Sequence, residues 1–192
     1  MISTDKIKAW TAKYSYLFGP AYFAVLLVIT HFAWKWSFST SLSLGGAPQV
    51  WLWSTFNCSD FFQWFVEQLQ DAVFWFLNTV CGQNVYKMGE FILTIDSRSF
   101  VRIVWSCVGL KQLFIFTCII AFYPAAHGKK LWFIPLSAVL IFVINFFRIV
   151  AIIAHNQYVP TDFAVWHETS KYVFYGILFA WYVLWDQKIS KA

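Results

Sequence analysis

Residues 131–154, LWFIPLSAVLIFVINFFRIVAIIA, decide the fold class of this chain. They form an apolar run in which Arg148 is the single charged side chain. The hydrocarbon core of a bilayer is about 30 Å thick and is crossed by roughly 20 apolar residues in a helix. The stretch is therefore predicted to be a transmembrane helix, and lipid to be the solvent for much of the chain.

The composition of the whole chain agrees with a membrane protein. Apolar residues make up 60% of the 192 residues and charged residues 12%, against about 45–50% and 25% in soluble domains. The 12 Trp and 9 Tyr suit a protein with two membrane interfaces, where amphipathic rings collect. The net charge of +5 comes from lysines at the ends of apolar runs rather than along one helical face, which argues against a nucleic-acid partner. We expect one integral membrane domain, 1–192.

Four apolar runs are predicted to cross the membrane. They are residues 17–36, 108–123, 131–154 and 167–186. The first run follows a basic start but has no A-x-A-like cleavage site, so we expect an uncleaved anchor. Residues 37–106 form a long connection on the far side of the membrane. The prediction is an all-α integral membrane protein with about four transmembrane helices.

Two elements are expected within the 37–106 connection. Residues 59–80 carry several acidic side chains among aromatics, and because acids are costly in lipid, this segment is predicted to be a helix lying in the membrane interface. Residues 85–105 carry β-branched and aromatic side chains on both sides of Asp96 and Ser97, which favours a short β-hairpin. The Ser-, Gly- and Pro-rich residues 37–49 are predicted to be an irregular loop.

Lysines predict the orientation of the chain. They gather before the first span, between the second and third, and after the fourth: Lys6, Lys8, Lys13, Lys129, Lys130, Lys188 and Lys191. Four spans place these three regions on one side, which the positive-inside rule assigns to the cytoplasm. We expect a protein of the inner, cytoplasmic membrane with both termini in the cytoplasm. Residues 37–106 and 155–166 then lie outside.

This topology brings five polar side chains to one depth near the outer surface. They are Cys107, Asn145, Arg148, His155 and His167. Arg148 lies about 25 Å along its helix from Leu131, at 1.5 Å per residue, and Asn145 lies almost one turn below it on the same face. A thiol, a guanidinium, an amide and two imidazoles can therefore converge from three spans.

Each of these residues also has a structural interpretation. A buried cysteine usually behaves as a small hydrophobic residue, and an arginine near the end of a span can reach the headgroups. For Cys107 the surroundings favour a functional interpretation as well, because Gly109 leaves the backbone accessible and Lys111 lies about one helical turn further along. A helix N-terminus and a nearby cation both favour the reactive thiolate. The residues alone leave both interpretations open.

The other cysteines give little support for a metal or redox site. Cys58, Cys81 and Cys118 form no C-x-x-C pair with one another or with Cys107, so neither a zinc site nor a thioredoxin-like motif is expected. No metal or other cofactor is predicted. A disulfide between Cys58 and Cys81 is permitted outside the cytoplasm, but a straight helix over 59–80 would separate their Cα atoms by about 33 Å. The pairing stays open.

Three segments together resemble the exosortase/archaeosortase family. They are WSCVGLKQ (105–112), NFFRIVAI (145–152) and HETSKYVFYGILFAW (167–181). The family pattern is a Cys followed by a small residue and a Gly, an Asn-x-x-Arg in the next span, and a His or Arg that opens the following one. Cys107 with Gly109, Asn145 with Arg148, and His167 match it. Val108 departs from it, because the family usually has Ser or Ala at this position. The resemblance covers about 100–185 and implies a compact, core-only member.

The resemblance implies a membrane cysteine protease or transpeptidase. Its substrates would be exported proteins with a carboxy-terminal sorting signal, made of a short motif, an apolar span and a basic tail. Cys107 would be the nucleophile, His167 the acid/base and Arg148 the oxyanion-stabilising group. Asn145, Gly109 and Lys111 would support them, with His155 as the alternative acid/base. No cofactor is implied, and membrane lipid is the other expected partner.

Two other functional classes remain as alternatives. A four-span thiol-disulfide oxidoreductase could use Cys58, Cys81 and Cys107, but it needs a closely spaced redox pair that the sequence lacks. A non-enzymatic assembly factor of exopolysaccharide or secretion machinery would use the polar cluster only for structure. For the protease or transpeptidase, the sequence leaves open whether water or an amine receives the acyl group.

Overall fold

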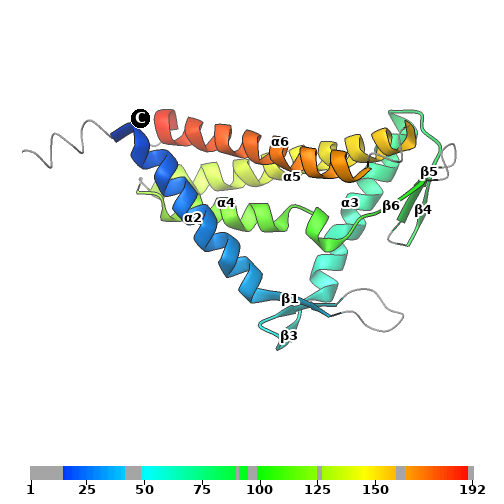
Figure 1. Cartoon of the computed structure of the whole chain (residues 1–192), viewed down its shortest axis with the longest axis horizontal. Helices are drawn as coiled ribbons and strands as arrows, with labels where there is room; N and C mark the ends of the chain where they lie inside the picture. The colour runs from blue at the N-terminus through cyan, green and yellow to red at the C-terminus, as the bar shows by residue number, and fades with distance from the viewer. Residues whose placement is uncertain are drawn as a thin grey trace, which may run out of the picture.

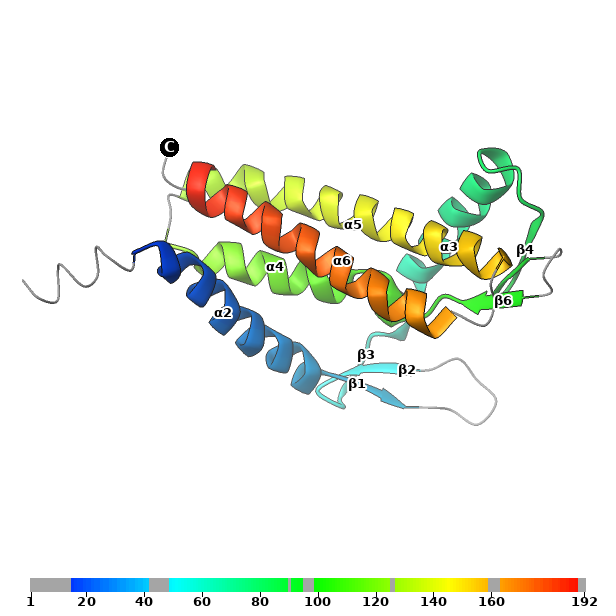
Figure 2. The same ribbon diagram turned by 45° about the horizontal axis from the view of Figure 1, so that its top comes forward.

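The chain forms a bundle of helices with two small β-sheets attached to it. The computed structural model describes residues 15–41, 49–89, 91–94, 99–124, 127–158 and 163–189. The bundle consists of α2 (Ser15–Ser37), α4 (Leu110–Phe122), α5 (His127–Tyr158) and α6 (Phe163–Leu184), followed by a π-helical turn, η3 (Trp185–Ile189). Helices α4, α5 and α6 run alongside one another, α2 diverges from them, and α3 (Ser59–Thr79) crosses at the other end (Figures 1 and 2).

The longest helix contains the run that is predicted to cross the membrane. Helix α5 has 32 residues and continues through Pro135. Among the residues that the structure describes, its segment His127–Asn156 is the one that is long and apolar enough by itself to cross a bilayer. Helix α4 is shorter than the predicted span over 108–123, because it begins only at Leu110 and has 13 residues. It measures about 20 Å.

Helix α3 is a single continuous helix of 21 residues. It occupies Ser59–Thr79 of the predicted 59–80 segment. Cys58 immediately precedes it and Cys81 follows it, and both thiols are free. The break that a disulfide between these two cysteines would need is absent, because one buried stripe, Phe62, Val66, Gln70, Val73 and Leu77, holds the whole helix against its neighbours.

Two three-stranded antiparallel sheets flank α3. The first consists of β1 (Phe38–Ser41), β2 (Gln49–Leu52) and β3 (Phe56–Asn57). The prediction of an irregular loop over 37–49 was wrong at 38–41. Strand β1 pairs with β2 along its full length, and the ring of Phe38 packs against Trp34 and Phe62 at centroid distances of 4.3 and 5.4 Å. Phe62 and β2 lie farther along the chain and Trp34 lies on the preceding helix, so the composition of 38–41 alone does not reveal the strand.

The second sheet lies in the region predicted as a hairpin. It consists of β4 (Val85–Met88), β5 (Phe91–Thr94) and β6 (Ser99–Arg102), in the order β4-β5-β6. Asp96 and Ser97, the predicted turn, lie outside the described residues. One face of this sheet is buried, and Lys87 of β4 forms an ion pair with Asp71 of α3. The chain leaves β6 directly toward Cys107.

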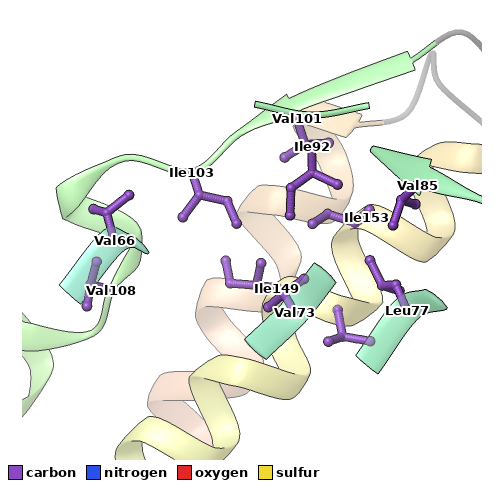
Figure 3. Close-up of a cluster of buried hydrophobic side chains, with 11 residues drawn as sticks. Val66, Val73, Leu77, Val85, Ile92, Val101, Ile103, Val108, Ile149 and Ile153 are labelled. Carbon is purple, nitrogen blue, oxygen red and sulfur yellow. The ribbon is translucent and has the colours of Figure 1, made fainter. Parts of the chain in front are cut away.

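The helix bundle and the second sheet share one hydrophobic core. It joins α3, the β4–β6 sheet and the end of α5 (Figure 3). Its buried members are Val66, Val73, Leu77, Val85, Ile92, Val101, Ile103, Val108, Ile149, Val150 and Ile153. Val108 follows Cys107 in the chain and Ile149 follows Arg148, so the core holds both segments that carry candidate catalytic residues.

A second core lies toward the opposite end of the bundle, between α4, α5, α6 and η3. Helix α2 joins it through two tyrosine hydroxyls. Tyr182 of α6 donates to the carbonyl of Gly19 at 2.9 Å, and Tyr22 donates to the carbonyl of Phe122 at 2.6 Å. As a result, α2 begins at the same end of the molecule as η3 ends, and the β4–β6 sheet lies at the other end (Figure 1).

Candidate active site

Cys107 ends a turn that precedes α4. The turn, η1 (Trp105–Cys107), is a 3-10 helix, and the N–H of Cys107 donates to the carbonyl of Val104 at 2.7 Å. The sequence places Cys107 at the N-terminus of the following helix, but the N-cap of α4 is Gly109. Cys107 therefore ends a 3-10 turn two residues before the cap and is not part of the α-helix. Its side chain is half-buried.

Gly109 is required by its backbone conformation and by a close neighbour. Its φ is +91°, in the left-handed region where a Cβ clashes with the backbone. A Cβ there would also lie 3.4 Å from the side chain of Asn145. Glycine at this position thus redirects the chain from the turn of Cys107 into α4 and lets α5 approach it.

Asn145 joins the cysteine segment to the arginine. Its side chain is 3% exposed. The amide Nδ2 donates to the carbonyl oxygen of Cys107 at 2.7 Å, and the amide Oδ1 accepts a hydrogen bond from Arg148 Nη1 at 3.4 Å. Both functional ends of one buried amide are therefore used between Cys107 and Arg148.

Arg148 also reaches α6. Its Nε donates to the hydroxyl of Ser170 at 3.0 Å, and that hydroxyl donates to the carbonyl of His167 at 2.9 Å. The guanidinium interacts electrostatically with Cys107, and also with Tyr175 and Glu168. One hydrogen-bonded path thus runs from Cys107 on the turn before α4, through α5, to the first turns of α6.

The two candidate histidines have different surroundings. His167 interacts electrostatically with Arg148, and its Nδ1 lies 3.9 Å from Glu168 Oε1. That carboxylate accepts a hydrogen bond from Lys171 Nζ at 2.5 Å. His155 instead packs its ring against Trp166, with ring centroids 4.1 Å apart. The structure therefore associates His167, rather than His155, with Arg148.

The remaining candidates lie outside this path. Lys111 interacts electrostatically with Lys35 and His31 of α2, so its charge lies toward that helix. All four cysteines are free. Within the described part of the chain, no group of three His, Cys, Asp or Glu side chains is arranged to hold a metal ion.

Sequence reasoning missed Ser170. A serine three residues after a histidine is common in helices and carries no specific signal. Its spacing from His167 is the one that lets a helical serine bond to the carbonyl of the preceding turn. The sequence does not show which donor bonds to the Ser170 hydroxyl. That donor is Arg148, which is 22 residues away in the chain.

Comparison with known families assigns the chain to a protein family. A family model described as transmembrane exosortase matches residues 9–184. The chain belongs to this family. The resemblance predicted from residues 100–185 is confirmed, and the match also takes in α2, α3 and both sheets of this exosortase. No curated protein and no solved structure shows a matching similarity.

Membership of the family also shows that this exosortase is a membrane protein. The described part of the chain is mostly helical, as predicted. Cys107, Asn145, Arg148 and His167 all lie inside the matched residues.

Replacing Gly109 with alanine should destabilise the protein by about 1–2 kcal/mol, because the left-handed conformation is costly for any residue with a Cβ. Gly176→Ala on α6 is the matched control, since a Cβ at that position meets no atom within 4 Å. Thermal unfolding of both variants in detergent measures the difference. Equal unfolding temperatures would contradict the constraint assigned to Gly109.

Proposed function

We propose that this exosortase is a membrane cysteine protease or transpeptidase that cleaves the carboxy-terminal sorting signals of exported, tail-anchored proteins through an acyl-enzyme. The observation that carries the proposal is the hydrogen-bonded path from the Cys107 carbonyl through Asn145 and Arg148 to Ser170 and the His167 carbonyl. The path holds a cation between the backbones of two residues that carry a thiol and an imidazole, on three separate segments. Nucleophilic catalysis needs this combination.

In the proposed reaction, the Cys107 thiolate attacks the carbonyl carbon of the scissile peptide bond and forms a C–S bond. The negative charge that develops on the carbonyl oxygen is stabilised by Arg148, and a fixed donor of this kind contributes about 3–4 kcal/mol. His167 protonates the leaving amine as the C–N bond breaks. Water or an acceptor amine then attacks the thioester and releases the Cys107 thiolate.

The proposed orientation places this site at the outer face of the inner membrane, with both termini in the cytoplasm. Helix α4 begins at the end of the bundle opposite to the end where α2 begins (Figure 2), and Cys107 precedes the start of α4 in the chain. A chain whose termini face the cytoplasm would therefore present Cys107 to the outside, where exported substrates are found.

An apolar groove beside Cys107 supports a substrate with an apolar span. The groove has a volume of about 480 Å³ and lies between α3 and α5. Trp64 and Phe65 of α3 face Phe142 and Phe146 of α5 across it, and Val108 lies at its edge. We propose that the substrate span lies in this groove, with α3 as its lateral wall. Because Val108 follows Cys107 directly, the scissile bond would then meet the thiol.

Replacing Cys107 with alanine should abolish cleavage of a co-expressed exported protein that carries a short motif, an apolar span and a basic tail. Arg148→Ala should lower cleavage by about 100- to 1000-fold, because it removes the oxyanion-stabilising group. Immunoblots of substrate size measure both effects. Cys118→Ala and Arg102→Ala, outside the path, are the matched controls and should retain cleavage. Continued processing by Cys107→Ala would leave a non-enzymatic assembly role.

The two histidines should differ in their effect on cleavage. His167→Ala should lower the rate by about 100-fold or more, which is the usual contribution of general acid–base catalysis. His155→Ala should retain most of the rate, because His155 packs on Trp166 rather than beside Arg148. Initial rates with purified protein in detergent test this. The opposite order would assign the acid/base role to His155.

A photo-crosslinking residue placed at Val143 should capture the substrate. Val143 lines the groove and is 46% exposed, whereas Val28 of α2 is 54% exposed and is not among the groove residues. In the Cys107→Ala background, which retains uncleaved substrate, position 143 should cross-link to the substrate span and position 28 should not. Equal yields at both positions would show that the groove does not hold the substrate, even where cleavage by the unsubstituted protein is normal.

A further inference from the structure

We propose that Ser170 is a positioning residue that sets the orientation of the Arg148 guanidinium toward the substrate. The proposal rests on the proposed peptidase function, in which Arg148 stabilises the oxyanion. Ser170 lies on α6, three residues after His167, and its hydroxyl contacts groups on two different helices. It lies within the residues that the family model matches, but it is not one of the Cys, Asn-x-x-Arg and His positions of the sequence pattern.

The polarity of the two hydrogen bonds is determined by their partners. A serine hydroxyl has one proton to donate. The carbonyl of His167 can only accept, so the Ser170 hydroxyl donates its proton there, at 2.9 Å. The lone pairs of the hydroxyl oxygen then accept a hydrogen bond, which Arg148 Nε donates at 3.0 Å. Because arginine has only donors, the two bonds are compatible in this direction alone.

Ser170 and Asn145 together determine which way the guanidinium faces. Ser170 holds Nε, and Asn145 Oδ1 holds Nη1 at 3.4 Å. Within the described part of the chain, Nη2 has no acceptor. A planar guanidinium held at two of its three nitrogens has one orientation, and the third nitrogen remains for the carbonyl oxygen of a substrate. Ser170 also ties this orientation to the helical turn that carries His167.

Ser137 provides a matched serine with the same bonding away from the site. Its hydroxyl donates to the carbonyl of Phe133 at 2.7 Å and accepts a hydrogen bond from Trp181 Nε1 at 2.9 Å. Like Ser170, it bonds to the preceding turn of its helix and to a nitrogen donor on another helix. A purely structural contribution of such a serine would be the same at both positions.

The test compares Ser170→Ala, Ser170→Thr and Ser137→Ala with the unsubstituted protein. Each is purified in detergent and assayed with a peptide that spans the sorting signal of the cleaved substrate. Ser170→Ala should lower kcat on the order of tenfold with little change in KM, the effect of losing one hydrogen bond to a charged group. Ser170→Thr keeps a hydroxyl that can bond to the preceding turn and should restore kcat.

Ser137→Ala should lower the unfolding temperature and leave kcat unchanged. Alanine is a better helix former than serine, so Ser170→Ala is expected to fold. An unchanged kcat in Ser170→Ala, a loss confined to KM, or an equal loss of kcat in Ser137→Ala would each overturn the positioning role. Absence of cleavage by the unsubstituted protein, or cleavage by Cys107→Ala, would instead overturn the proposed function on which this role rests.

Discussion

The hydrogen bond from Asn145 to the carbonyl of Cys107 is the constraint on which the arrangement of this exosortase depends. The amide is almost fully buried, and a buried polar group without a partner costs about 1–3 kcal/mol. The carbonyl belongs to the 3-10 turn before α4, and the Asn145 amide supplies its donor. Each group therefore needs the other. This hydrogen bond fixes the position of the cysteine turn along the axis of α5. It thereby also fixes the distance from Cys107 to Arg148.

Two hydrophobic cores stabilise different parts of this arrangement. The core around Val108 and Ile149 surrounds the cysteine and arginine segments and ties them to α3 and the β4–β6 sheet. The other core holds α4, α5 and α6 together at the opposite end. Both regions combine apolar packing with hydrogen bonds between helices: Asn145 and Arg148 bond across the site, and Tyr182, Tyr22 and Trp181 bond across the other end. The site thus rests on helices that are anchored at both ends.

The sequence predicts the parts of this structure that follow from local pattern. The long apolar run of α5 and the acid-bearing helix at 59–80 are recognisable from residue type alone. The common depth of Cys107, Arg148 and His167, which follows from counting spans, stays a prediction. The strand at 38–41 is missed because its partners, Trp34, Phe62 and β2, are identified only in three dimensions. The late start of α4 depends on the positive φ of Gly109. A glycine in the sequence permits this conformation but does not show that it is adopted. Ser170 is missed because the rotation of α6 relative to α5 is not encoded in spacing.

The shortness of α4 has a consequence for the surrounding lipid. In the proposed topology α4 crosses the membrane. A helix of about 20 Å would then not match a hydrocarbon core of about 30 Å, and this hydrophobic mismatch would be relieved either by thinning of the bilayer or by submersion of the turn that precedes the helix. In both cases the Cys107 turn lies closer to the membrane midplane than the ends of the longer helices do. A peptide bond at the margin of an apolar segment can then meet the thiol without the segment leaving the lipid. For the proposed peptidase, membrane thickness would thereby be a physical variable that sets which bond along a substrate is within reach.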